Sequence, residues 1–271
     1  MTTNYEELTR GCAAIARTAG HAIMRIYDDD FVIERKDDNS PLTAADLAAH
    51  RSILDGLQVL APQIPVLSEE SADEIPWSVR RNWSRYFLVD PLDGTREFIK
   101  HNGEFTVNIA LIEDGEPTLG VVFAPVLDEM YCAWSGGHAY LAISQTENEP
   151  LRTRRRADPL VVAGSRSHAD PRLLAALAKL GAHELVALGS SLKFCRAAQG
   201  LADLYIRYGL TSEWDTAAGQ CVLEQAGGGV TTLDGKPLRY NGKESLLNPD
   251  FLAFGDTTVD WAGRLRGEAV A

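Results

Sequence analysis

The chain has 271 residues, of which 45% are hydrophobic and 24% are charged, a composition typical of one or two folded globular domains. Its 26 Lys and Arg residues against 38 Asp and Glu residues give a formal net charge of -12. This charge argues against general electrostatic binding to nucleic-acid polymers or anionic membranes, so any anionic ligand must be held by local cations.

Cysteine usage and the absence of long apolar runs indicate a compartment. The four cysteines are scattered and form no CxxC motif, and the opening MTTNYEELTR is too acidic for a signal peptide. No apolar stretch approaches the roughly 18 to 20 residues that span a bilayer. We therefore expect a cytoplasmic protein with no transmembrane segment, and leave open peripheral attachment at the cytoplasmic face of the inner membrane.

The first half begins with helices and continues with hairpins. Apolar residues at helical intervals predict an amphipathic helix over 5–27, preceded by a capping box of Thr3 and Glu6. A short strand is expected within 31–36, and a second helix over 44–60 with Thr43 as its cap. VLSEES begins with a strand whose end carries two glutamates, and YFLVD is a strand with an acid at its C-terminal end. Four apolar runs between 106 and 144, separated by DG and GG turns, predict an antiparallel meander.

Residues 145–159 are polar and charged, so we place a domain boundary near residue 150. Beyond it, LVVAGS, ELVALGS, ADLYIRY and GGVTTL are typical of strands, and PRLLAALAKLG, SLKFCRAAQG and TAAGQCVLEQAG of helices. This alternation predicts an α/β domain over 151–271 after an α+β domain over 1–150. The arginines between 152 and 156 could form a phosphate patch, although a solvated strand edge or loop is the commoner meaning.

The strongest chemical signal is VDPLDGTREF at 89–98. Asp90 and Asp93 flank a Pro-Leu pair at the end of a strand, and Pro91 stiffens the turn between them. Two close carboxylates repel each other unless a cation or a proton neutralises the charge. Oxygen ligands favour Mg²⁺, Mn²⁺ or Ca²⁺ over zinc, and we favour Mg²⁺. An Asx-rich surface turn with a helix cap is the alternative.

The DGT turn also indicates where an anion could bind and which group acts as the nucleophile. Gly94 and Thr95 would expose backbone N–H groups to an anion, so that phosphate and metal could meet there. A DGT turn after a strand is also typical of phosphatases whose aspartyl nucleophile lies two residues before the second Asp. That position is Pro91 here. A metal-activated water is therefore the expected nucleophile.

Further acids occur in comparable places. Glu69 and Glu70 follow the VLS strand, Asp46 lies in the first turn of the second predicted helix, and Asp215 follows Trp214 at a helix start. Each alone is a plausible cap or solvated charge, and Asp215 could simply cap the helix TAAGQCVLEQAG. Together with Asp90 and Asp93, they could supply the carboxylates of a two-metal phosphoryl-transfer site.

Four segments resemble the inositol monophosphatase superfamily of Mg²⁺-dependent, lithium-sensitive phosphatases: LSEES, VDPLDGTREFI, NGEFTVNIALI and EWDTAAGQ. The match covers most of the chain. Within that superfamily, SPLTAADLAAH, GSRSH, GSSLKFC and the run from DGTREFI to NGEFTVNIAL are similar to CysQ-type 3'(2'),5'-bisphosphate nucleotidases. The resemblance implies a five-layered α/β/α/β/α sandwich with metals at the junction of its two halves.

The resemblance also implies roles for individual residues. Two or three Mg²⁺ ions would be held by Glu69, Asp90, the Leu92 carbonyl, Asp93 and Asp215. Most of these ligands lie in the first domain, and Asp215 lies in the second. Glu70 is left outside the metal shell. Catalysis would rest on Asp46 and Thr95, which orient and deprotonate the attacking water, together with Glu69.

The resemblance places the substrate pocket mainly in the second domain. The 5'-phosphate and nucleoside would contact His168, Ser190, Lys193 and Arg207, and the scissile phosphate would contact Leu92, Asp93, Gly94, Thr95 and Asp215. Lys193 offers a point charge and Arg207 a fork for phosphate. Each of these residues has an ordinary alternative as a surface or helix-terminal group.

The implied activity is removal of the 3'-phosphate from 3'-phosphoadenosine 5'-phosphate, a by-product of sulfur assimilation, without a phosphoenzyme. Inositol monophosphatase or fructose 1,6-bisphosphatase activity is the alternative within the superfamily, because all would share the metal site. A noncatalytic phosphate- or metal-binding protein is the alternative from another class. The expected partner is a small phosphate monoester and no polymeric nucleic acid, with a homodimer left open.

Overall fold

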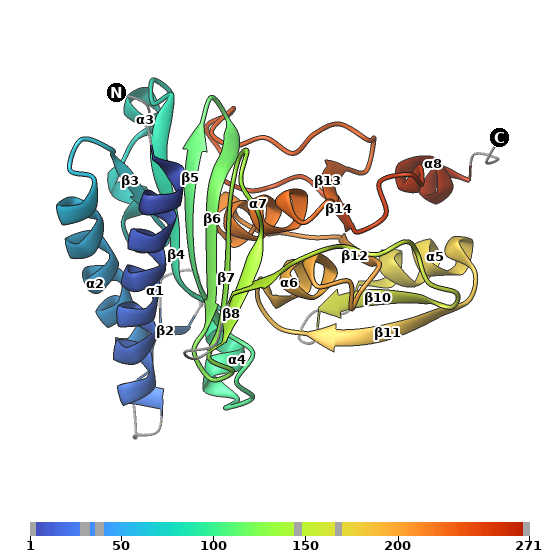
Figure 1. Cartoon of the computed structure of the whole chain (residues 1–271), viewed down its shortest axis with the longest axis horizontal. Helices are drawn as coiled ribbons and strands as arrows, with labels where there is room; N and C mark the ends of the chain where they lie inside the picture. The colour runs from blue at the N-terminus through green and yellow to red at the C-terminus, as the bar shows by residue number, and fades with distance from the viewer. Residues whose placement is uncertain (1–3, 28–32, 36–40, 144–147, 166–169, 268–271) are drawn as a thin grey trace.

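The computed structural model describes residues 4–27, 33–35, 41–143, 148–165 and 170–267. Two β-sheets alternate with three layers of helices, as Figure 1 shows. The helices α1 (Tyr5–Tyr27) and α2 (Ala44–Leu60) form one outer layer. They cover one face of the larger sheet. The five-layered α/β/α/β/α fold class predicted from the sequence is confirmed.

The larger sheet has seven strands in chain order. They are β3 (Val66–Ser68), β4 (Arg85–Asp93), β5 (Thr106–Glu113), β6 (Glu116–Ala124), β7 (Glu129–Trp134), β8 (Tyr140–Ile143) and β9 (Glu149–Pro150). Only β3 and β4 pair in parallel; the others form the predicted antiparallel meander. Because helices cover both faces, β5 and β6 are nearly continuous apolar runs. A separate pair joins β1 (Ile33–Arg35) to β2 (Pro41–Thr43).

Helices α1 and α2 have the bounds predicted from the sequence. Helix α1 buries Leu8, Cys12, Ala19 and Ile23 against the sheet at helical spacing. The predicted capping box involves Thr3, which lies outside the described residues, as does the side chain of Thr43. At the start of α1, Asn4 accepts a hydrogen bond from the Glu7 amide at 3.2 Å.

The smaller sheet has five strands in the order β11-β10-β12-β14-β13. They are β10 (Leu160–Ser165), β11 (His183–Leu188), β12 (Leu204–Arg207), β13 (Gly229–Thr232) and β14 (Phe251–Phe254). Helices α5 (Pro171–Leu180) and α8 (Trp261–Arg266) pack on its outer face. Helices α6 (Leu192–Ala198) and α7 (Ala217–Gln225) lie between the two sheets. The sequence patterns do not predict β14 or α8.

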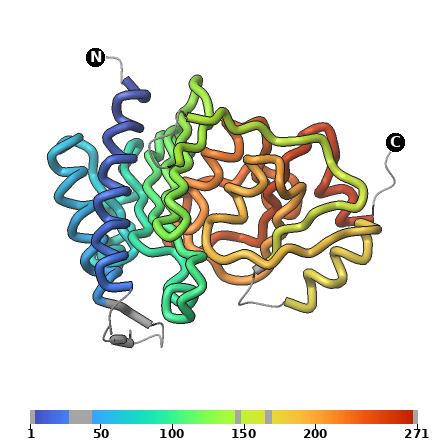
Figure 2. Tube along the Cα trace, turned by 60° about the horizontal axis from the view of Figure 1, so that its bottom comes forward, coloured from blue at the N-terminus to red at the C-terminus, as the bar shows by residue number. Residues whose placement is uncertain are grey.

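One apolar core joins the two halves. It contains Tyr131 of the larger sheet, Cys221 of α7 and Phe251 of the smaller sheet. The larger sheet ends at Pro150 and the smaller begins at Leu160. Figure 2 shows α1 and the C-terminal helix at opposite ends of the molecule. Because the core is continuous, the division into domains at residue 150 stays a prediction.

The basic run between the sheets anchors a loop. Arg154 makes two hydrogen bonds to Asp203, of 2.9 and 3.0 Å, and Arg155 lies 3.8 Å from Asp256. The backbone amide of Ala157 in the same connection and that of Val161 in β10 also donate to Asp203. These ion pairs fit the loop interpretation of the run and not a phosphate patch. In the described part of the chain, no helix has the length and apolar character needed to cross a membrane.

Candidate active site

A β-bulge at the end of β4 brings two carboxylates together. Asp90 pairs with Asn108 of β5, whereas Asp93 pairs with Thr106, so β4 has one extra residue in this interval. Residues three apart on a regular strand point to opposite faces of the sheet. The bulge allows Asp90 and Asp93 to join the same cluster, and the Leu92 amide holds the turn by donating to Asp90 Oδ1 at 3.1 Å.

Acids that are far apart in the sequence gather around Asp90. Burial raises the pKa of Asp90 well above its usual range, and Glu69, Asp93, Asp215 and Asp46 raise it further. Burial also raises the pKa of Asp215, with added repulsion from Asp93 and Glu69. The predicted acids therefore form one cluster whose charges oppose each other.

Two structural elements, α2 and the 3-10 helix η1 (Glu69–Glu74), carry three further acids. Asp46 is buried in the first turn of α2, and Glu69 and Glu70 begin η1 after β3. Carboxyl oxygens of these three residues lie within 4.8 Å of one another. Glu70, which the sequence leaves outside the metal shell, is thus close to two predicted site residues.

Asp215 comes from the second half of the chain. It ends the 3-10 helix η2 (Glu213–Asp215), and its Oδ2 accepts a hydrogen bond from the Ser212 amide at 2.9 Å. The N-cap residue of α7 is Thr216. The alternative in which Asp215 merely caps α7 is therefore wrong, because its side chain turns back to the start of its own short helix.

Asp93 has two partners that the sequence did not single out. Its Oδ2 accepts hydrogen bonds from Ser191 Oγ at 2.9 Å and from Asn108 Nδ2 at 3.3 Å. Burial raises the pKa of Asp93, while the nearby Lys193 and these two hydrogen bonds lower it. One of these partners had a signal in the sequence: Asn108 is a polar residue inside the apolar run TVNIALI. The residue is only 1% exposed.

The turn after β4 requires glycine. Gly94 has φ = 94° and is the N-cap of α4 (Thr95–Ile99). A Cβ at this position would lie 3.3 Å from the Glu104 carbonyl oxygen, in addition to the strain of a left-handed backbone. Thr95 then starts α4 with its Oγ1 3.4 Å from the Leu92 carbonyl oxygen. Thr95 is therefore held next to the end of the acidic cluster.

A pocket of about 280 Å³ opens over this cluster. Eight residues predicted for the site line it: Glu69, Asp93, Gly94, Thr95, Ser190, Lys193, Arg207 and Asp215. Leu92 is buried behind the turn, and His168 lies outside the described residues. The lining also includes Arg96, Glu97 and Tyr205, which the sequence did not single out.

Two cationic side chains of the pocket, Lys193 and Arg207, already make contacts within the protein. Lys193 Nζ donates to the Ser190 carbonyl at 2.5 Å and lies 5.3 Å from the centre of the Tyr205 ring. Burial lowers the pKa of Lys193 to about 8, although Asp93 opposes this. Arg207 donates one hydrogen bond to the Leu210 carbonyl at 2.8 Å.

Two buried polar atoms of the lining are left for a ligand. Arg207 Nε and Ser190 Oγ have no hydrogen-bond partner among the described residues. Ser190 also has φ = 42°, unusual for a residue other than glycine. Because unpaired buried polar groups are costly, these atoms are suited to bind a polar ligand in the pocket.

Comparison with known proteins places this arrangement in a family. The model of the inositol monophosphatase family matches residues 4–257. The chain belongs to the inositol monophosphatase family. It is 55% identical over 239 residues to a Shigella flexneri protein named 3'(2'),5'-bisphosphate nucleotidase CysQ, a match that covers 88% of this chain and 95% of that protein. The protein of the same name from Escherichia coli K12 is 54% identical over the same shares.

Solved structures of this family have the same fold. The crystal structure of CysQ from Bacteroides thetaiotaomicron superposes with a TM-score of 0.81 at 39% identity, covering 93% of this chain and 98% of that one. The inositol monophosphatase family is metal-dependent, and the clustered acids of this member fit that dependence. Their donors are carboxylate oxygens, which hard divalent cations prefer, and a cation would relieve the repulsion that raises the pKa values of Asp90 and Asp215.

Proposed function

We propose that the protein is a Mg²⁺-dependent 3'(2'),5'-bisphosphate nucleotidase that converts 3'-phosphoadenosine 5'-phosphate to AMP and phosphate. The observation that carries this proposal is the 55% identity, over 88% of the chain, to a protein named for that activity. The pocket supports it, because it combines an acidic cluster with three cationic side chains and unpaired donors.

The proposed metal ligands are the carboxylates of Glu69, Asp90, Asp93 and Asp215 and the carbonyl of Leu92, holding two or three Mg²⁺ ions. Bound Mg²⁺ would supply an acidified water and neutralise charge on the phosphate. The raised pKa values of Asp90 and Asp215 support this set, because such carboxyl groups are stabilised as anions by a cation.

We assign the orientation of the attacking water and the removal of its proton to Asp46 and Thr95. Thr95 Oγ1 lies at the Leu92 carbonyl, and Asp46 is 2% exposed on a helix that is packed against the larger sheet. A rigid, buried carboxylate can orient a hydroxyl and accept its proton without reorganising, which lowers the barrier to attack. Glu69, at the pocket wall, would hold the same water in line with the phosphorus.

The second phosphate is assigned to the cationic side of the pocket. A bisphosphate nucleotide carries about three to four negative charges at neutral pH, because the second pKa of a phosphate is near 6. Lys193, Arg207 and Ser190 line the pocket together with the acids. The guanidinium donor and hydroxyl that have no partner in the described chain support a phosphate contact. The contact of His168 with the substrate and the cytoplasmic location stay predictions, and a homodimer stays open.

The test is phosphate release from 3'-phosphoadenosine 5'-phosphate, inositol 1-phosphate and fructose 1,6-bisphosphate, each with and without Mg²⁺. We expect the highest kcat/KM for the nucleotide and no release after chelation. A higher kcat/KM for inositol 1-phosphate or fructose 1,6-bisphosphate would replace the nucleotidase with one of the other activities of the family. Binding of the nucleotide with no turnover of any substrate would indicate a noncatalytic protein.

A further inference from the structure

The turn that carries Asp215 is held from outside the pocket. Asp215 lines the pocket together with Asp93 and Glu69, and like charges on these carboxylates repel its own. Its own turn supplies only the Ser212 amide as a hydrogen-bond donor to the side chain. The side chain can stay in the cluster only if the backbone of the turn is fixed.

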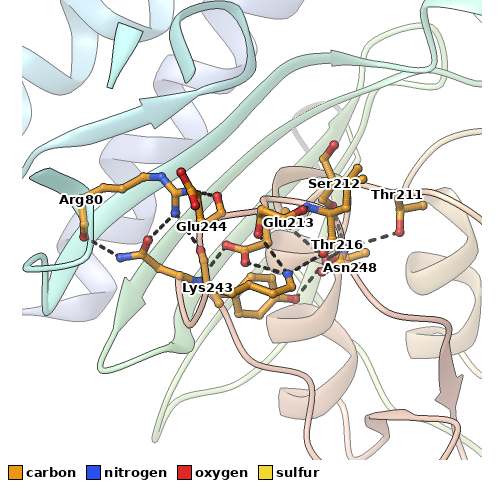
Figure 3. Close-up of polar contacts among 12 residues, drawn as sticks. Arg80, Thr211, Ser212, Glu213, Thr216, Lys243, Glu244 and Asn248 are labelled. Carbon is orange, nitrogen blue, oxygen red and sulfur yellow. Dashed lines mark hydrogen bonds and ion pairs between the residues drawn. The ribbon is translucent and has the colours of Figure 1, made fainter. Parts of the chain in front are cut away.

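Asn248 contacts the chain on both sides of Asp215, through the backbone of Thr211 and Ser212 before it and the side chain of Thr216 after it. Its Nδ2 lies 2.7 Å from the Ser212 carbonyl oxygen and 3.0 Å from Thr216 Oγ1, and its backbone amide donates to the Thr211 carbonyl at 2.7 Å. Figure 3 shows Asn248 among Thr211, Ser212 and Thr216. Asn248 is 7% exposed, so water does not compete for these bonds.

Glu213, at the start of η2, is held by the same loop. Its amide donates to the Leu246 carbonyl at 2.8 Å, and its Oε2 accepts from the Asn241 amide at 2.8 Å. Lys243 Nζ lies 3.8 Å from Glu213 Oε1. The loop between Asn241 and Asn248 has no helix or strand of its own, so these contacts also hold the loop in place.

Arg80 connects this loop to the first half of the chain. It ends α3 (Trp77–Arg80), and its guanidinium donates to Asn241 Oδ1 at 2.8 Å and to the Glu244 carbonyl. The Asn241 side chain donates back to the Arg80 carbonyl at 2.7 Å. Arg80 is 3% exposed, and Figure 3 shows it at the end of the network opposite Asn248.

We propose that Asn248 is a positioning residue for Asp215, and that Arg80 supports it through the loop between Asn241 and Asn248. The inference rests on the proposed metal-dependent function, in which Asp215 is a ligand. Partners that orient a metal ligand without touching the metal typically change affinity by about 10- to 100-fold when they are lost. The network should therefore set metal affinity and not only fold stability.

The test uses Mn²⁺ binding to the full-length, chelator-treated protein, with free Mn²⁺ followed by electron paramagnetic resonance. Asp215→Asn first identifies the Mn²⁺ site that depends on Asp215. Asn248→Leu keeps a similar side-chain volume and removes the donors, and we expect its Kd at that site to rise about tenfold. Asp256→Ala is the control, because Asp256 is a buried carboxylate that accepts hydrogen bonds from Thr258 and the Arg156 amide, away from η2.

Each outcome has one meaning. A Kd for Asn248→Leu within a factor of two of wild type, while Asp215→Asn weakens binding, overturns the positioning role and leaves the metal site intact. No effect of Asp215→Asn removes Asp215 from the proposed metal site, and the positioning role with it. If Asn248→Leu does not fold, Arg80→Met tests the far end of the network: a Kd raised about threefold supports the inference, and an unchanged Kd overturns it.

Discussion

The hydroxyl of Ser191 donates a hydrogen bond to Asp93 Oδ2 at 2.9 Å. Ser191 Oγ also lies 2.7 Å from the Asp215 carbonyl oxygen, and it accepts a hydrogen bond from Asn108 Nδ2 at 3.0 Å. One hydroxyl at the start of α6 thus touches both the bulge of β4 and the turn of η2. The two halves of the chain meet at this atom, and each contributes an acid to the cluster.

Replacing Ser191 should raise the Mg²⁺ requirement. In Ser191→Ala, Asp93 loses a hydrogen bond that lowers its pKa, so its carboxyl group keeps its proton to a higher pH. Because Mg²⁺ competes with that proton, the Mg²⁺ concentration for half-maximal activity should rise by about tenfold, and more at pH 6.5 than at pH 8.5. An increase of equal size at both pH values would contradict the proton competition.

Asp90→Asn should abolish the activity of the protein and, at the same time, stabilise its metal-free fold. A raised carboxyl pKa in the folded state lowers stability as pH rises above the unfolded value of about 3.9, so at pH 8 the metal-free protein bears this cost. The variant should gain about 1 kcal/mol in urea unfolding without metal, and lose more than about 100-fold in Mg²⁺-dependent phosphate release. A variant that is less stable than wild type without metal would show that the acids do not oppose each other.

Lys193→Met should affect the bisphosphate more than a simple monoester. We expect kcat/KM to fall about tenfold further for the nucleotide than for p-nitrophenyl phosphate, because only the nucleotide has a second phosphate to bind. Since burial lowers the Lys193 pKa to about 8, this preference should weaken in wild type as pH rises through that value. Lys179→Met is the matched control, because Lys179 also donates to a backbone carbonyl, that of Leu265, but outside the pocket. Equal losses on both substrates would favour a role for Lys193 in holding its own turn.

Glu224→Gln should stabilise the protein at alkaline pH. Burial, together with Glu116, raises the Glu224 pKa to about 7, although Gln220 and Arg239 oppose this. The folded state therefore keeps a proton that the unfolded state loses above about pH 4.3, and stability falls with pH up to about 7. The advantage of the variant should grow by about 1 kcal/mol between pH 6.0 and pH 8.5 in urea unfolding. The exposed Glu6→Gln serves as control, and an advantage of Glu224→Gln that does not change with pH would refute the assignment.

The parts of the fold that the sequence predicted are those with local periodicity. Helices α1 and α2 carry an apolar stripe long enough to define both ends, and the meander has turn signals between its strands. Strand β14 is four residues long and follows an irregular loop, so FLAF carries no period of its own. It forms because β12 and β13 both pair with it.

The acids of the site were predicted because motifs carry them, whereas their supports were not. The sequence predicts that Asp90 and Asp93 are close because they flank a Pro-Leu pair at the end of a strand, but their shared position also depends on a shift in the pairing of β4 with β5 that only the partner strand defines. Ser191 and Asn248 were not predicted because their partners are 98 and 32 to 37 residues away in sequence. Residues that act through tertiary contacts have no local signature.

The walls of the pocket come from segments as distant as Glu69 and Thr216, and one core unites both sheets. On the ribosome, the first half of the chain is synthesised before η2. The nascent polypeptide therefore carries the acids of the first half before Asp215, the acid from the second half, has been added. The pocket is complete only after η2 has joined the first half of the chain, which makes assembly of the acidic cluster a late event in the folding of each molecule.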